Sequence, residues 1–221
     1  MGDLDSHDGL CRRLANLAQC RVVSVDYRRS PEHPFPAAVI DAAAALRWVA
    51  ANAAELGVDP AQIAVGGDSA GANLAAVLGL MGRDGEAPMP CFQLLFYPVT
   101  DLTCALPSYD LFTERVTLTA DTMRWYAAQY LGGADPADWR ASPLHAALAG
   151  APPAFVLTAG YDPLRDEGIA YAQRLDAAGV HTTHLHMPTQ VHGFLTMGRV
   201  IRASDTAIET AGAMLRQVWQ V

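Results

Sequence analysis

The chain has 221 residues, of which 51% are hydrophobic and 17% are charged. This balance excludes a disordered or low-complexity protein, and the length suits one large domain or two small ones. Acidic side chains outnumber basic ones by 23 to 15, all the basic ones are arginine, and the formal net charge is −8. A net acidic surface argues against nucleic acid, and against an anionic membrane surface, as the main partner.

Neither a secretory signal nor a membrane span is expected. A signal needs a basic start followed by an apolar run, and residues 1–8 supply neither. No apolar stretch approaches the ~20 residues of a membrane helix. The cysteines form no CxxC pair and are too sparse for a disulfide scaffold. We therefore expect a cytoplasmic protein whose cysteines are buried thiols: Cys11, Cys20, Cys91 and Cys104.

Short β-rich runs alternate with longer helical runs along the first half of the chain. Residues 21–26 form the first predicted strand, and apolar spacings of three and four predict a helix over residues 37–56. A second strand is predicted at 62–66, a small-residue helix at 71–82 and a third strand at 92–97. This alternation predicts an α/β fold with a mostly parallel sheet and helices on both faces.

The second half resumes this alternation after a long irregular stretch at residues 98–153. Because that stretch is too long for a plain turn, we interpret it as an insertion within a single domain spanning residues 1–221. It contains a helix at 118–131, with Thr119 as its predicted N-cap. The remaining predicted elements are strands at 154–159 and 182–187 and helices at 166–178 and 204–219.

The most informative motif is Gly-Asp-Ser-Ala-Gly at residues 67–71, between a predicted strand and a predicted helix. This context is typical of a nucleophile elbow, a sharp turn that holds Ser69 in a strained conformation with its hydroxyl exposed. We expect Gly67 and Gly71 because a side chain at either position would collide with the neighbouring strand or helix. The helix N-terminus after Ser69 favours developing negative charge.

A serine nucleophile needs a base and an orienting acid. Asp162 follows the predicted strand 154–159, at the edge where open α/β sheets place their sites. Asp166 and Glu167 are rival carboxylates, but first-turn capping and charge in the next helix suit them better. Asp162 is therefore the predicted acid, with a simple turn residue before a proline as the alternative interpretation.

His192 is the predicted base because it alone of the seven histidines follows the last predicted strand and precedes a glycine. His184 and His186 share one face of that strand, but no Cys or carboxylate is spaced to complete a zinc site. His181 lies beside the same strand, and His7, His33 and His145 suit loops or helix surfaces. The resulting order Ser69, Asp162, His192 is that of the α/β-hydrolase triad.

These motifs carry a resemblance to a known family. Gly-Asp-Ser-Ala-Gly at 67–71, the run Asp-Pro-Leu-Arg-Asp-Glu at 162–167 and His-Gly-Phe at 192–194 resemble the bacterial hormone-sensitive lipase family of esterases, in its GDSAG branch. The run at residues 26–38 also matches the family. The resemblance implies an α/β-hydrolase fold that hydrolyses short- to medium-chain acyl esters without metal or organic cofactor.

Carried over by position, the resemblance makes Ser69 the nucleophile, His192 the general base and acid, and Asp162 the orienting carboxylate. The backbone N–H of Ala70 becomes one oxyanion donor. Family members carry an HGGG-type motif, which supplies the other donors, just before the region matching residues 2–8. The sequence printed here begins at Met1. We therefore expect an N-terminally truncated hydrolase, with that motif encoded in frame upstream.

Three functions stay open at this stage. The leading one is a carboxylic ester hydrolase acting on a small-molecule ester through an acyl-enzyme. An inactive or weakly active truncated fragment is the second. The third is a non-catalytic small-molecule binder on the same scaffold, like the gibberellin receptors, which have lost the catalytic histidine. A homodimer could form through the last helix or an exposed strand edge.

Overall fold

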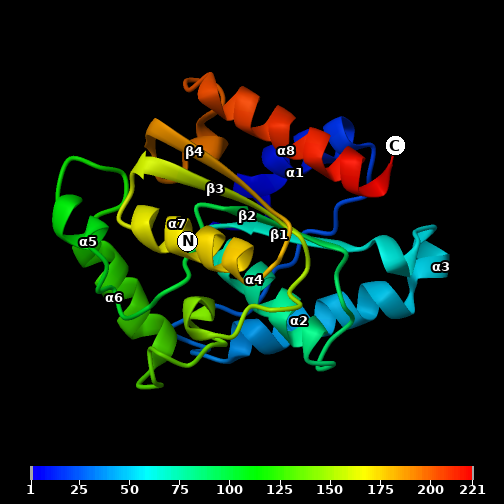
Figure 1. Cartoon of the computed structure of the whole chain (residues 1–221), viewed down its shortest axis with the longest axis horizontal. Helices are drawn as coiled ribbons and strands as arrows, with labels where there is room; N and C mark the ends of the chain where they lie inside the picture. Colours follow the sequence, from blue (N-terminus) through cyan, green and yellow to red (C-terminus); the bar gives the residue numbers. More distant parts are fainter. Residues whose placement is uncertain (1, 221) are drawn as a thin grey trace. The chain divides into compact units, whose positions relative to one another are not determined.

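A computed structural model describes residues 2–220. Its sheet has four parallel strands in the order β1-β2-β3-β4, which are Ala64–Asp68, Phe92–Phe96, Ala154–Tyr161 and Thr182–Val191 (Figure 1). Because all four run the same way, the residues that follow them lie at one edge of the sheet, the carboxyl edge.

The strand predicted at residues 21–26 is wrong. That segment is irregular, and Val22, Val23 and Val25 within it are 41%, 50% and 38% exposed. Its β-branched residues favour a strand only where a neighbouring strand can form hydrogen bonds with it. The described sheet ends at β1, so no strand of this sheet pairs with the segment. Among the correctly predicted strands, β4 extends beyond its predicted end, through Pro188, because it is an edge strand and tolerates a proline.

The helices largely follow the prediction, with one split and two omissions, the first helix and a short helix at residues 108–111. Asn52 divides the predicted long helix into α2 and α3. The unpredicted helix α1, Leu4–Ala18, is capped by Asp3, whose carboxylate accepts the backbone N–H of Ser6 while the Ser6 hydroxyl accepts that of Asp3. The other helices are α2 Ala37–Ala51, α3 Ala53–Leu56, α4 Ala70–Arg83, α5 Ser108–Leu111, α6 Ala120–Leu131, α7 Arg165–Ala177 and α8 Ala203–Trp219.

Helices α4 and α7 pack on the same face of the sheet (Figure 1). Gly79 of α4 lies against Gln93 of β2, and Gly168 of α7 lies against Thr158 of β3. Gln93 pairs with Ala154, and side chains alternate along a strand, so Gln93 and Thr158 share that face. The opposite face carries buried residues as well, including the edge-to-face pair Phe96 and Phe155.

Residues 98–153 carry α5, α6 and a short 3-10 turn. Thr119 caps α6 as predicted, its hydroxyl accepting the backbone N–H of Thr122 at 3.2 Å. Asn73 of α4 ties this stretch down, because its buried amide donates to the carbonyls of Val99 and Ala141. Residues beyond β2 are thereby fixed to the helix that follows β1.

Residues 2–26 and 193–220 form a compact unit separate from residues 27–192. Within it, α1 contacts α8, and Gly212 leaves so little room that a Cβ there would lie 2.7 Å from Leu17. Arg13 pairs with Asp205 at 2.7 Å, and the Ser204 hydroxyl donates to the Leu195 carbonyl.

The expectation of four buried cysteines is wrong. Only Cys104 is buried, and Cys11, Cys20 and Cys91 are partly exposed. Cys20 lies just past the end of α1 and Cys91 just before β2, where coverage is incomplete. Among residues 2–220, no helix combines the length and apolarity that crossing a membrane requires.

Candidate active site

Ser69 lies in a tight turn between β1 and α4. Its φ of 53° and ψ of −116° fall where non-glycine residues are uncommon, so the predicted strained turn is present. Two backbone bonds hold it there: Ser69 N–H donates to the Phe96 carbonyl at 2.9 Å, and the Ser69 carbonyl accepts the Val99 N–H at 3.4 Å. The strain is therefore fixed by the neighbouring strand.

The two glycines of the motif differ in what requires them. A Cβ on Gly67 would lie 2.3 Å from the Gly71 carbonyl carbon and 2.8 Å from the Ala72 nitrogen, both backbone atoms that cannot move aside. A Cβ on Gly71 would meet nothing within 4 Å. The steric expectation is therefore confirmed for Gly67 and wrong for Gly71, which faces open space in the first turn of α4.

The three predicted site residues lie together at the carboxyl edge of the sheet. Ser69 follows β1, Asp162 follows β3 and His192 follows β4. His192 Nε2 is 2.9 Å from Ser69 Oγ, and His192 Nδ1 is 2.7 Å from Asp162 Oδ2. A continuous hydrogen-bonded path therefore joins the carboxylate to the hydroxyl through the imidazole.

Burial and second hydrogen bonds fix the two supporting side chains. Asp162 is fully buried, and its other oxygen, Oδ1, accepts the Leu164 N–H at 2.9 Å. The His192 side chain is 12% exposed. The backbone carbonyl of His192 accepts a hydrogen bond from the Thr117 hydroxyl at 2.8 Å. A buried carboxylate that accepts a hydrogen bond from Nδ1–H keeps the proton on Nδ1, so Nε2 is free to accept the proton of Ser69.

The rival carboxylates have other partners. Asp166 pairs with the neighbouring Arg165 at 2.7 Å. Glu167, expected to charge the first turn of its helix, is instead fully buried and accepts three hydrogen bonds. Their donors are the backbone N–H groups of Thr100 at 2.6 Å and Asp101 at 3.1 Å and the Tyr109 hydroxyl at 2.8 Å.

Burial raises the pKa of Glu167 to about 8, although its hydrogen bonds partly offset this. Glu167 lies in the first turn of α7 as predicted, but its side chain is buried and turned toward the segment after β2. Glu167 fastens that segment to the residues that directly follow Asp162.

Tyr97 is a neighbour of the site that was not predicted from the sequence. It directly follows β2, is 1% exposed and has a φ of 35°, a region that bulky residues rarely adopt. Its ring centroid lies 4.8 Å from that of His192. A Tyr-Pro pair at the end of a predicted buried strand is the signal that could have found it.

The paired histidines on β4 meet one hydroxyl. Thr158 Oγ1 lies 2.9 Å from His184 Nε2 and 2.8 Å from His186 Nδ1. Burial lowers the pKa of each imidazole, and the neighbouring His186 lowers that of His184 further. His145, expected on a loop or helix surface, places its Nε2 at hydrogen-bond distance from Asp101 Oδ1, 3.0 Å.

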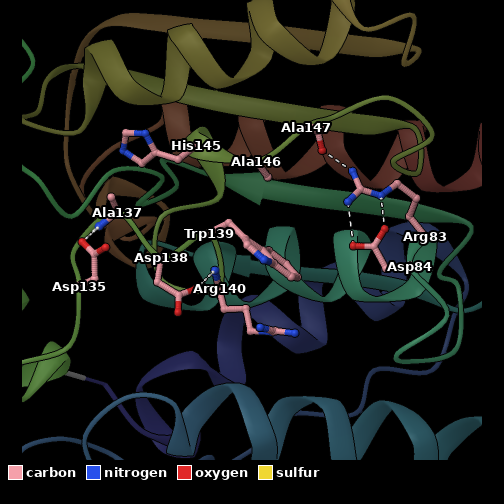
Figure 2. A pocket seen from close by; sticks show the side chains of 10 residues that line it. All are labelled: Arg83, Asp84, Asp135, Ala137, Asp138, Trp139, Arg140, His145, Ala146 and Ala147. Carbon is pink, nitrogen blue, oxygen red and sulfur yellow. Dashed lines mark hydrogen bonds and ion pairs between the residues drawn. The ribbon is translucent and has the colours of Figure 1, made fainter.

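A surface hollow of about 540 Å³ lies elsewhere on the chain (Figure 2). Figure 2 shows Arg83 paired with Asp84 and donating to the Ala147 carbonyl, while Arg140 lies beside Trp139. None of the three predicted site residues lines it, and its arginines already have partners.

Comparisons with known proteins agree on one family. A family profile described as alpha/beta hydrolase fold matches residues 1–196. The carboxylesterase NlhH of Mycobacterium tuberculosis is 46% identical over 98% of this chain and 70% of its own length. The ethyl acetate hydrolase of Pseudomonas putida is 40% identical over 98% of this chain and 69% of its own length.

A solved structure shares both fold and sequence. The structure of EstE1, a thermostable carboxylesterase cloned from a metagenomic library, superposes with a TM-score of 0.94 at 45% identity. The match covers 99% of this chain and 76% of EstE1.

Proposed function

Because the chain belongs to the alpha/beta-hydrolase fold family, we propose that it hydrolyses carboxylic esters through an acyl-enzyme formed on Ser69. The observation that carries the proposal is the path of two short hydrogen bonds from Asp162 through His192 to Ser69. Relatives named as carboxylesterase and ethyl acetate hydrolase support ester hydrolysis as the reaction.

In the acylation step, His192 Nε2 takes the proton of Ser69 Oγ as that oxygen attacks the ester carbonyl carbon. Asp162 holds the imidazole in the required tautomer and stabilises the imidazolium. His192 then gives the proton to the leaving alcohol as the ester C–O bond breaks. In deacylation His192 takes a proton from water, the resulting hydroxide attacks the acyl carbon, and Ser69 recovers its proton.

The negative charge that forms on the carbonyl oxygen needs hydrogen-bond donors. Ala70 begins α4, so its backbone N–H stands at the positive end of the helix dipole, beside Ser69. We assign this N–H as one oxyanion donor. Esters of short to medium acyl chains are the proposed substrates, as the family resemblance implies.

Hydrolysis of p-nitrophenyl acetate and its longer acyl homologues tests this proposal. We expect saturable turnover by the chain and loss of all saturable turnover in Ser69→Ala, with an unchanged melting temperature because the change removes only one hydroxyl. Undiminished turnover in Ser69→Ala, or none in the unaltered folded chain, would overturn the proposal.

A further inference from the structure

We propose that Tyr97 is a positioning residue for His192: its ring, and not its hydroxyl, holds the face of the imidazole. This inference rests on the proposed function. Tyr97 follows β2, the strand between β1 and β3, so each of the four strands delivers one residue to the site at its carboxyl end. Three of these residues form the hydrogen-bonded path, and the fourth contacts its central imidazole.

The hydrogen bonds of His192 leave one rotation of its imidazole ring unrestrained. The bonds to Asp162 and Ser69 lie in the imidazole plane and fix where its two nitrogens point. They do not fix the tilt of the ring about the line that joins them. The Tyr97 ring, 4.8 Å away and tilted by 58°, packs against the imidazole and limits that tilt.

The backbone holds Tyr97 in this position against its preference. A φ of 35° is strained for a tyrosine and persists only where neighbouring bonds fix it. Here Tyr97 N–H donates to the Leu157 carbonyl of β3 at 2.6 Å, and the preceding residue, Phe96, accepts the N–H of Ser69. The residue that carries the ring is therefore tied to the strand before Asp162 and to the nucleophile turn.

The aromatic ring is the part of this side chain that orients the imidazole of His192. Its hydroxyl lies 3.5 Å from Asp68 Oδ2, the limit of a useful hydrogen bond. With 1% exposure, Tyr97 is closed off from solvent and therefore from bound substrate. It can act on the reaction only through its neighbours, of which His192 is the reacting one.

The acyl-enzyme makes this contact more important. Once Ser69 Oγ is esterified it has no proton to donate, and the bond that aims Nε2 is lost. The imidazole then keeps one bond, to Asp162, while it must orient a water molecule. Removal of the Tyr97 ring should therefore lower kcat, which includes deacylation, without raising KM.

Steady-state kinetics of three variants, normalised by active-site titration with a fluorophosphonate, test the proposal. For Tyr97→Leu we expect kcat to fall about 10- to 100-fold with no rise in KM, because small misplacements of a catalytic group cost this much. Tyr97→Phe should retain kcat within about threefold, because the ring remains. Tyr171→Leu removes an equally buried tyrosine ring from the core and should lower stability but leave kcat unchanged.

Tyr97→Met, which fills much of the space without a rigid ring, replaces Tyr97→Leu if the latter does not fold, with the same expected loss. An unchanged kcat in the ring-deleted variant overturns the inference while the proposed function stands. A loss in Tyr97→Phe equal to that in Tyr97→Leu also overturns it, because the hydroxyl would then be the working group. Absence of saturable turnover in the unaltered chain overturns the proposed function and, with it, this inference.

Discussion

Replacing Asp162 with Asn tests the hydrogen-bonded path at its buried end. One carboxylate oxygen accepts the Leu164 N–H and the other accepts His192 Nδ1–H. An asparagine can place its single carbonyl oxygen on only one of them. If that oxygen stays on Leu164, the amide NH₂ faces Nδ1 and requires it to be unprotonated, so the imidazole proton moves to Nε2. His192 then presents a donor to Ser69 and cannot take its proton.

The opposite orientation keeps the tautomer but sets the NH₂ group against the Leu164 N–H, two donors in a fully buried place. Either arrangement is costly, and a buried acid of this kind is worth about 10⁴ in kcat. At ~1.36 kcal/mol per factor of ten, this loss corresponds to about 5 kcal/mol of transition-state stabilisation.

Turnover of p-nitrophenyl acetate by Asp162→Asn, with Asp166→Asn as the matched control, measures this loss. Asp166 is ion-paired to its neighbour Arg165 and lies four positions further on, so its variant should keep kcat within about threefold. Equal losses in the two variants would refute the assignment of Asp162, and so would an Asp162→Asn enzyme within tenfold of the unaltered chain.

Four further substitutions have expected outcomes. Gly67→Ala places a Cβ 2.3 Å from the backbone of Gly71 and should lower the free energy of unfolding by at least ~2 kcal/mol. Gly71→Ala meets no neighbouring atom and should not lower it. Equal melting temperatures for the two variants would contradict this expectation. Gly160→Ala would set a Cβ 2.0 Å from the Pro188 carbonyl oxygen and should be similarly destabilising in denaturant titrations; an unchanged midpoint would show that β4 shifts freely. Glu167, an acid whose pKa rises from 4.5 to about 8 on folding, contributes stability that is complete below pH 4.5 and is lost as pH rises through about 8. Glu167→Gln should flatten this part of the stability–pH curve, and a curve identical to that of the unaltered chain would contradict the assignment.

Most of the sheet and its crossover helices could be predicted from the sequence, because buried parallel strands and capped helices leave local signals. Strands β2 and β3 are nearly continuous apolar runs, and Thr119 and Gly132 mark the two ends of α6. Residues 21–26 show the limit of that reasoning. Their β-branched residues favour an extended strand. Whether a neighbouring strand is present to form hydrogen bonds with it cannot be read from the local sequence.

Helix α1 was missed for a different reason. Its capping pair, Asp3 and Ser6, departs from the usual pattern with Glu or Gln at the third helical position. Its Gly9 and its polar residues also weaken the helical signal, so contacts with α8 decide its structure.

The predicted site residues could be placed from chain order and strand ends alone, since parallel strands bring their carboxyl ends to one edge. What could not be read is the burial of the side chains around them. Glu167 looked like ordinary helix charge, and nothing local marks that it would accept bonds from Thr100 and Asp101. The strained φ of Tyr97 is likewise held by a hydrogen bond to Leu157 of β3, a contact that only the folded sheet provides.

Trapping the acyl group on the chain tests the central claim most directly. The chain is mixed with p-nitrophenyl acetate, quenched in acid within the first turnovers, digested and examined by mass spectrometry. The proposed mechanism predicts one acetyl group on the hydroxyl of Ser69 in the peptide that contains residues 67–71, and a larger acetylated fraction in Asp162→Asn if deacylation is slowed more than acylation. An acetyl group on another residue, or rapid turnover with no acylated Ser69 under any quench time, would contradict it.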